Sequence, residues 1–327
     1  MLYYELLCLI YVVLNVVVGI IYKTMNVDVF FINLVSSVII FLTFFIKNYT
    51  TNKEKDDKKN EKLIRNLTTK EAIIIGASGC FSFISSLLAL KNLPLSIFIP
   101  LSNTWILFSL FFEKILLNTD IKPHNILVFI ILFFGIMLVT YTKNSKSSMN
   151  YNYLYIGLVL VSSIIRAFHI TYVKQQSENF DEDELLTMDY FINIIIGIVL
   201  FIGYVAYQKK YTFPKIYILF IILGTILILD NSKNYLKFLS IKNLSEEKYV
   251  LLYNTSLIFS LVFGYFIFNE KITKYKVFGN IVILVSIGLY VLFNKKQDKL
   301  LKEYEIINNT EENEVSKIHN EVSKIPN

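Results

Sequence analysis

The chain has 327 residues, of which 54% are hydrophobic and 18% are charged. This apolar fraction exceeds what a soluble domain of this length needs for its core, so it indicates a membrane protein. The formal net charge of +6 does not indicate nucleic-acid binding, because the lysines gather at the ends of apolar runs and in one loop. We therefore expect the lipid bilayer as a partner and no nucleic acid.

Apolar runs of about 18–22 residues recur along the chain and match the thickness of a hydrocarbon core. They lack the strict alternation of β-barrel strands. The sequence therefore predicts an all-α polytopic membrane protein of about ten transmembrane helices. The predicted spans are residues 2–22, 29–46, 71–90, 94–112, 124–142, 153–173, 187–207, 215–236, 249–268 and 275–293.

Two segments are polar and do not follow this pattern of apolar runs. Residues 48–70 predict a cytosolic loop, and residues 296–327 predict a disordered tail, because neither has apolar side chains to bury. With the N-terminus inside, the inner loops and tail hold 20 Lys and Arg residues and the outer loops hold 10. Positive residues favour the cytosolic side, so both termini are predicted to be cytosolic. An endomembrane or organelle is slightly favoured as the location.

The chain also repeats itself. A shift of 151 residues places Leu88–Leu110 over Leu239–Leu261, and 10 of these 23 positions are identical. We therefore predict one five-helix repeat over residues 1–147 and a second over 148–295. An odd number of spans reverses the second repeat, and inverted repeats are typical of secondary transporters with a midplane site between the halves.

Ionisable side chains within spans are costly and need a reason. Arg166 and His169 lie one turn apart in the sixth predicted span, and Asp230 and Lys233 share one face of the eighth. Arg166 is a candidate for anion binding, or else a structural partner. Asp230 and Lys233 are candidates for proton coupling and substrate binding, or else form a structural pair. His169 is either a packed polar residue or a proton relay.

Three asparagines are further candidates for substrate binding. Asn103 and Asn254 occupy equivalent positions in the two repeats, so we expect both near one central cavity. Their amides can donate and accept hydrogen bonds to a polar ligand, or can join helices to one another. Asn15 is placed opposite Arg166 by the repeat and is the third candidate.

No catalytic or cofactor motif accompanies these residues. The sequence contains no Gly-rich phosphate loop and no metalloprotease or hydrolase motif, so we expect no enzyme activity and no cofactor. Cys8 and Cys80 fall inside spans and the three histidines are widely separated, which argues against a metal site. The small residues Gly135, Gly279 and Gly288 indicate helix packing, either within the bundle or at a homodimer face.

Two stretches carry a family resemblance. The end of the ninth span, from Phe266 to Ile272, is followed by glycines in a final apolar helix, and Ala89–Ser96 joins the third and fourth spans. These features resemble the EamA-type repeats of the drug/metabolite transporter superfamily, in which a Glu, here Glu270, closes the ninth span. The resemblance covers about residues 1–295 and implies ten spans in inverted five-helix repeats.

The spacing from Asn103 to Glu113 resembles the fourth span of nucleotide-sugar and sugar-phosphate transporters, whereas Ser102 and Thr255 depart from the basic residues often found there. The resemblance implies an alternating-access carrier or exchanger for a small organic, phosphorylated anion, with a cavity lined by spans one, three, four, six, eight and nine. Two alternatives stay open. They are a proton-coupled amino-acid or drug exporter, and a membrane scaffold without transport.

Overall fold

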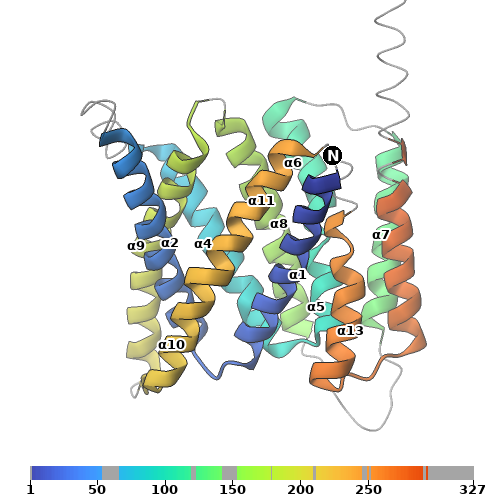
Figure 1. Cartoon of the computed structure of the whole chain (residues 1–327). Coiled ribbons are helices and arrows are strands. Elements are labelled where there is room, and N and C mark those ends of the chain that lie inside the picture. The colour runs from blue at the N-terminus through green and yellow to red at the C-terminus, as the bar shows by residue number, and fades with distance from the viewer. Residues whose placement is uncertain are drawn as a thin grey trace, which may run out of the picture.

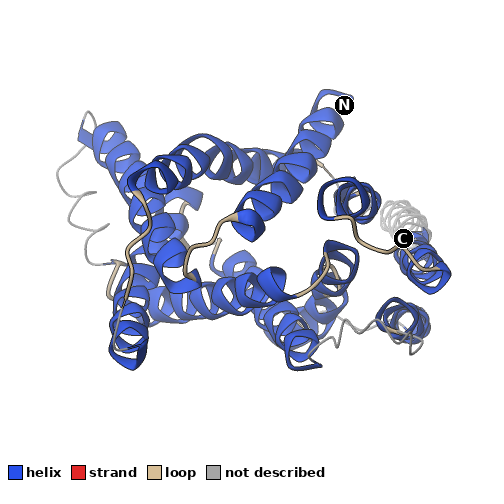
Figure 2. Ribbon diagram, turned by 90° about the horizontal axis from the view of Figure 1, so that it is seen from below, coloured by secondary structure: helices blue, strands red, loops and turns tan. Residues whose placement is uncertain are grey.

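The computed structural model describes residues 2–53, 66–118, 123–141, 153–177, 179–208, 211–244, 249, 252–289 and 292–293. These residues form helices and short connections, without a strand among them. The helices stand side by side in one bundle (Figures 1 and 2). The polar tail, residues 296–327, lies outside the described residues, as does the middle of the predicted 48–70 loop.

The helices of the first repeat are α1 (Leu2–Thr24), α2 (Val29–Lys53), α4 (Lys70–Asn92), α5 (Leu95–Ser102), α6 (Trp105–Leu117) and α7 (Pro123–Thr140). Those of the second are α8 (Tyr153–Gln176), α9 (Glu182–Gln208), α10 (Ile216–Gly224), the π-helical turn η1 (Thr225–Asp230), α11 (Asn231–Asn243), α13 (Ser256–Phe268) and a final helix over 274–289. Every predicted span overlaps one of these elements. The helix α2 continues to Lys53, so the polar loop begins later than its composition indicates.

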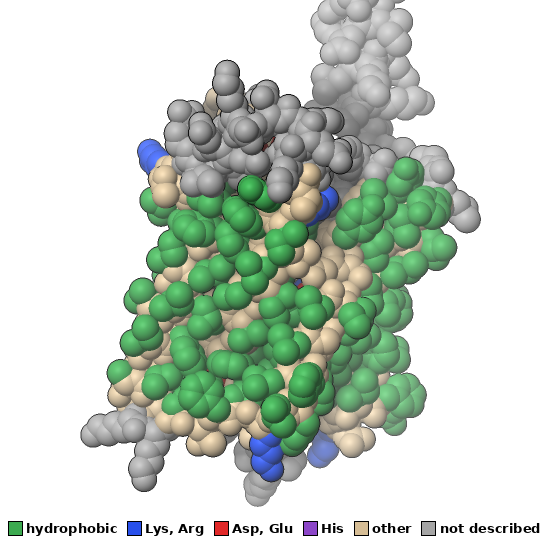
Figure 3. Space-filling view, turned by 60° about the vertical axis from the view of Figure 1, so that its left-hand side comes forward, with side chains coloured by type: hydrophobic (Ala, Val, Ile, Leu, Met, Phe, Trp, Pro, Cys, Tyr) green, Lys and Arg blue, Asp and Glu red, His purple; other side chains and the backbone are tan. Residues whose placement is uncertain are grey.

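The outer surface fits a bilayer. Seven helical stretches in the described residues are long and apolar enough to cross a membrane, and α7 and α13 supply shorter apolar helices. Apolar side chains cover the flank of the molecule, and Lys and Arg side chains lie at its two edges (Figure 3). A multi-pass membrane protein is thus supported, while the count of ten spans stays a prediction.

The predicted repeat extends to the ends of the helices. The bounds of α6 and α13 differ by the same shift of 151 residues, and both helices end at an asparagine in the left-handed region, Asn118 (φ 53°) and Asn269 (φ 51°). Asparagine tolerates this conformation at a helix end better than most residues. Likewise α4 and α11 end at Asn92 and Asn243, each followed by an extended leucine. The two repeats therefore share local structure as well as sequence.

The packing of the helices also follows the repeat. The helix α4 packs on α8, and its equivalent α11 packs on α1, while α2 packs on α9. The end of α4 lies beside Lys23 at the end of α1, whereas Ser240 near the end of α11 lies beside Cys8 at the start of α1. Equivalent helices thus run in opposite directions, which is the inverted arrangement that five spans per repeat require.

The small residues join helices within the chain. A Cβ on Gly135 of α7 would lie 3.2 Å from the carbonyl oxygen of Gly279, and one on Gly279 would lie 2.7 Å from the Val139 nitrogen. These two glycines therefore let α7 and the final helix approach each other closely, whereas a Cβ on Gly288 would meet nothing within 4 Å. The homodimer stays a prediction, and Gly135 and Gly279 are already in contact inside the chain.

Candidate functional site

A cavity of about 560 Å³ lies between the two repeats. This volume is typical of small-molecule sites. At one end its lining residues Leu90 and Leu95 are buried, whereas at the other end Lys174 and Ser177 are exposed. We call these the closed end and the open end. The lining comes from α1, α2, α4, α5, α8, α9, η1 and α11, together with Asn103 after α5 and Tyr253 of the predicted span 249–268. The helices α2 and α9 therefore join those that the sequence predicted.

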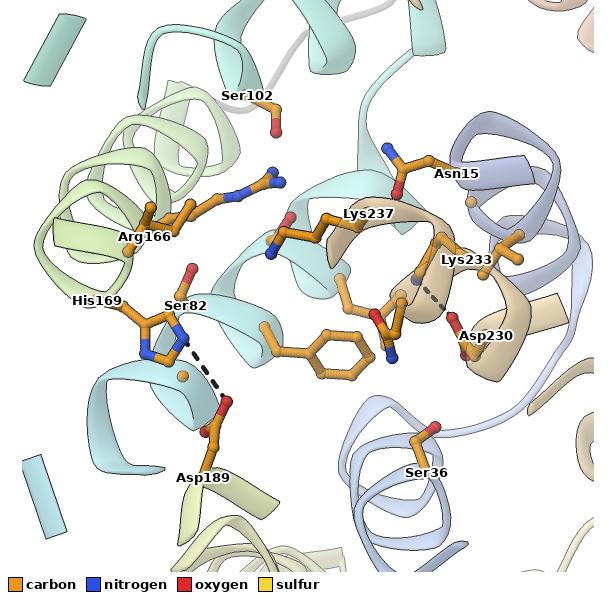
Figure 4. A pocket seen from close by; sticks show the side chains of 18 of the residues that line it. Asn15, Ser36, Ser82, Ser102, Arg166, His169, Asp189, Asp230, Lys233 and Lys237 are labelled. Atoms are coloured by element: carbon orange, nitrogen blue, oxygen red, sulfur yellow. Dashed lines mark hydrogen bonds and ion pairs between the residues drawn. The ribbon is translucent and has the colours of Figure 1, made fainter. Parts of the chain in front are cut away.

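Arg166 on α8 points into this cavity (Figure 4). Its guanidinium carbon lies 5.2 Å from the ring centre of Trp105 and 5.9 Å from that of Tyr253, and it donates a hydrogen bond to the Tyr253 hydroxyl at 3.3 Å. Tyr253 in turn stacks on Tyr11 at 5.9 Å. Cation–π contacts hold the guanidinium in place, and the hydrogen bond to Tyr253 uses one of its five N–H groups.

A second cation, Lys237 on α11, points into the same space (Figure 4). Within the described part of the chain its ammonium makes no hydrogen bond and no ion pair. The eighth predicted span, residues 215–236, ends one residue before Lys237 and so assigns Lys237 to the following loop. That assignment is wrong, because α11 continues to Asn243 and keeps Lys237 on the cavity wall.

Lys233, one turn earlier, has a partner. Its ammonium lies 2.5 Å from the Asp230 carboxylate, and that carboxylate also accepts a hydrogen bond from Tyr22 of α1. The side chain of Asp230 is 5% exposed, so its charge requires such partners. Asp230 ends the π-helical turn, and π-helical turns are frequent at functional sites. Lys233 and Asp230 both line the cavity, and their contacts match the structural pair more closely than separate roles in substrate binding and proton coupling.

His169 meets an acidic residue that the sequence reading missed. Its Nε2 lies 3.6 Å from the Asp189 carboxylate of α9, and its Nδ1 lies 3.1 Å from the Ser78 hydroxyl and the Ile75 carbonyl. Asn193 also donates to Asp189 at 2.9 Å. Asp189 stands two residues inside the predicted span 187–207, so its charge within an apolar run was the available signal.

Glycine makes room for this pair. A Cβ on Gly79 of α4 would lie 2.5 Å from the Asp189 carboxylate oxygen and 3.3 Å from the His169 ring. A side chain at this position would displace the carboxylate, which is why the residue facing Asp189 is small. His169 and Asp189 therefore form a polar unit at the junction of α4, α8 and α9.

Asn103 and Asn254, equivalent residues of the two repeats, are hydrogen-bonded to each other. The Asn103 amide donates to the Asn254 carbonyl oxygen at 3.2 Å and to the Ser256 hydroxyl at 2.9 Å. Both side chains are buried, and only Asn103 lines the cavity. These contacts correspond to the interpretation in which asparagines join helices. Asn15 lines the cavity on α1 and points into it (Figure 4).

Each asparagine also marks a tightened turn. The Ile106 nitrogen donates to the Asn103 carbonyl, three residues earlier, and the Leu257 nitrogen donates to the Asn254 carbonyl in the same way. These hydrogen bonds span three residues instead of four, so they interrupt the α-helical pattern at equivalent points of the two repeats. A 3₁₀ turn within a long helix often marks a hinge.

The closed end is held by charged side chains at helix ends. Glu270 accepts hydrogen bonds from the Leu95 nitrogen at 2.5 Å and from the Ser96 nitrogen at 3.1 Å, which are free donors at the start of α5. Lys276 donates to the Ser96 hydroxyl at 2.9 Å. Lys23 donates to the carbonyls of Leu90 (2.9 Å) and Leu93. Glu270 thus lies two residues beyond the end of α13 and binds the start of α5 in the other repeat.

Among the described residues, no group of His, Cys, Asp and Glu side chains is arranged to hold a metal ion. The cavity instead offers hydroxyl, amide, carboxylate and cationic groups. These are groups that bind a polar organic solute.

Two inverted helical repeats around a polar cavity, enclosed by an apolar surface, define a multi-pass membrane transport protein. Both repeats match the EamA-like transporter family, over residues 2–141 and 153–292, and the chain belongs to this family. A crystal structure described only as that of a protein is similar at a TM-score of 0.60 and 10% identity, covering 90% of this chain and 97% of the other. This likeness shows the fold alone. No curated protein matches the chain.

Proposed function

We propose that the protein carries a small organic anion across the membrane by alternating access, and that Arg166 and Lys237 bind its anionic group. The supporting observation is that two cations face one cavity while neither makes an ion pair within the described residues. Charges inside a membrane are paired or serve a substrate pathway. An anionic ligand between them would supply the missing partner.

A phosphate group fits this pair well. The planar fork of Arg166 suits bidentate contact with phosphate oxygens, and the Lys237 ammonium adds a mobile point charge. Lys237 takes the role that the sequence reading gave to Lys233, because Asp230 already neutralises Lys233. The cation pair thus favours a phosphorylated metabolite such as a sugar phosphate or nucleotide sugar.

The opposite wall suits a hydroxylated body. The Asp189 carboxylate accepts one hydrogen bond from Asn193 and keeps further acceptor capacity. Asn33, Ser36 and Asn234 also line this part of the cavity. Carboxylate and amide groups bind sugar hydroxyls through hydrogen bonds, so a ligand with an anionic end and a hydroxyl-bearing end would match both walls.

Counterflow in liposomes tests the proposal. Vesicles containing purified protein are preloaded with sugar phosphates, nucleotide sugars, nucleoside monophosphates or amino acids, and the labelled form is added outside. We expect saturable exchange of a phosphorylated ligand and at least a tenfold loss in Arg166→Ala and Lys237→Ala, since a hydrogen bond to a charged group contributes about 1.5–3 kcal/mol. The exposed Lys215→Ala is the matched control and should exchange normally. Unchanged exchange of every anion in both cavity variants would refute the anion role.

One observation favours a second function. The facing imidazole and carboxylate of His169 and Asp189 are groups that can exchange a proton, as a proton-coupled exporter of amino acids or drugs would need. In that case an imposed pH gradient would drive uptake of a neutral or cationic solute, and Asp189→Asn would uncouple it. Anion exchange that is independent of the gradient would exclude this alternative.

A further inference from the structure

At the closed end, Lys23 binds the carbonyl groups at the end of another helix. Its ammonium, at the end of α1, binds the carbonyls of Leu90 and Leu93, which belong to the last turn of α4 and its cap. The same ammonium lies 5.4 Å from the ring centre of Phe268 at the end of α13. The last carbonyls of a helix lack partners within that helix, and a cation there is favourable. One lysine thus joins three helices below the cavity.

The repeat supplies an equivalent lysine at the other end. A shift of 151 residues converts Lys23 into Lys174 on α8, and converts Leu90 and Leu93 into Ile241 and Leu244. The equivalence also holds in the backbone. Leu93 and Leu244 are both extended caps, with φ of −111° and −106°, and each donates its N–H to the carbonyl four residues earlier.

Lys174 lies at the open end. Gln175 beside it donates to the carbonyl of Leu116, near the end of α6, whereas Lys23 lies beside Leu93, just before α5 begins. The continuous stretch Leu95–Leu117 spans 23 residues, which at about 1.5 Å per residue separates the two ends by roughly 35 Å. The Lys174 side chain is 56% exposed and lies 3.5 Å from Glu113.

We propose that Lys23 and Lys174 are alternating helix caps. In the present state Lys23 caps α4 and shuts the closed end. In the opposite state Lys174 caps the equivalent carbonyls of Ile241 and Leu244 on α11, while Lys23 leaves α4 and that end opens. The inference rests on the alternating access of the proposed function, and it does not depend on what is carried.

Two caps of the same chemistry keep the two states close in free energy. Each cap exists in only one state, so removing one lysine changes the population ratio in a definite direction. Loss of Lys23 favours the opposite state, and loss of Lys174 favours the present one. A lysine with a merely structural role would not produce opposite shifts in a matched pair of variants.

Thiol labelling tests this without a substrate. Ser86 lines the cavity on α4, and Ser86→Cys in sealed vesicles is treated with a membrane-impermeant maleimide from either face. Cys8 and Cys80 are fully buried, so the wild-type chain gives the background. Relative to the Ser86→Cys parent, Lys23→Ala should raise labelling from the Lys23 face about two- to fivefold, and Lys174→Ala should lower it by a similar factor.

Lys23→Arg and Lys174→Arg keep the charge, so they should restore parental labelling and show that the alanine variants fail through the lost cap. Labelling that shifts in the same direction in both alanine variants, or in neither, would overturn the proposal. Because no solute is added, absence of anion exchange in counterflow would leave this test unaffected. The two proposals can therefore fail separately.

Discussion

The two ends of the cavity use charge in different ways. At the closed end, Glu270 and Lys23 bind backbone groups at the ends of α5 and α4. At the open end, Lys47 pairs with Asp183 at 2.8 Å, with side chains 54% and 32% exposed. A charge bound to helix termini inside a protein contributes more than an exposed ion pair, which contributes about 0–1 kcal/mol. The charge contacts therefore hold the closed end more firmly than the open end.

Removing the Glu270 contacts at the closed end should lower the free energy of unfolding by the largest amount. Glu270→Ala leaves the Leu95 and Ser96 donors without their acceptor and Lys276 without a neighbouring carboxylate. We expect it to lower the free energy of unfolding by about 2–4 kcal/mol, because hydrogen bonds to a charged group are lost together. Thermal unfolding in detergent measures the loss. Glu113→Ala at the open end is the matched variant, and an equal loss there would contradict the comparison.

A substitution that disturbs helix packing near the open end should lower the free energy of unfolding by an intermediate amount. Gly76 lies in the first turns of α4, where a Cβ would come within 2.8 Å of the Asp189 carbonyl and 2.4 Å of the Ile192 Cβ. Backbone cannot yield easily, so Gly76→Ala should destabilise the protein by about 1–3 kcal/mol. Gly157→Ala is the control, since a Cβ there meets nothing within 4 Å, and it should be neutral or stabilising. Equal unfolding temperatures for the two variants would show that α4 and α9 are not tightly packed.

Breaking the exposed ion pair between Lys47 and Asp183 should change the free energy of unfolding by the smallest amount. Lys47→Ala breaks the contact with Asp183, and we expect a change of about 0–1 kcal/mol in the free energy of unfolding because solvent screens both charges. The same melting experiment, repeated at low and high salt, measures it. A loss comparable with that of Glu270→Ala would mean that the open end is locked as firmly as the closed end.

Part of the candidate site can be predicted from signals that repeat or stand out in the sequence. Asn103 and Asn254 are candidates because a second copy of the motif lies 151 residues away, and Arg166 is a candidate because a charge within an apolar run is rare. Neither signal depends on knowing how the helices pack. The EamA-type resemblance rested on the same duplication, and it is confirmed over both repeats.

What the reading missed depends on helix ends and on contacts between distant segments. Lys237 lies beyond the last apolar residue of its span, but backbone hydrogen bonds continue the helix past that point. Asp189 stands near the start of its predicted span, and its position on the cavity wall beside His169 depends on how α8 and α9 pack. The bond between Asn103 and Asn254 requires the close approach of α5 and α13, which no local pattern encodes.

The bond between Asn103 and Asn254 has a mechanical consequence. A pair of equivalent residues that touch lies on the two-fold axis relating the repeats, and an axis is the one place that exchange of the repeats leaves unmoved. The contact between Asn103 and Asn254 can therefore stay intact in both states of the transporter while the ends of the helices move. Small rotations at the tightened turns would then be amplified along α5 and α6. The helices would rotate about the contact in which Asn103 binds both Asn254 and Ser256.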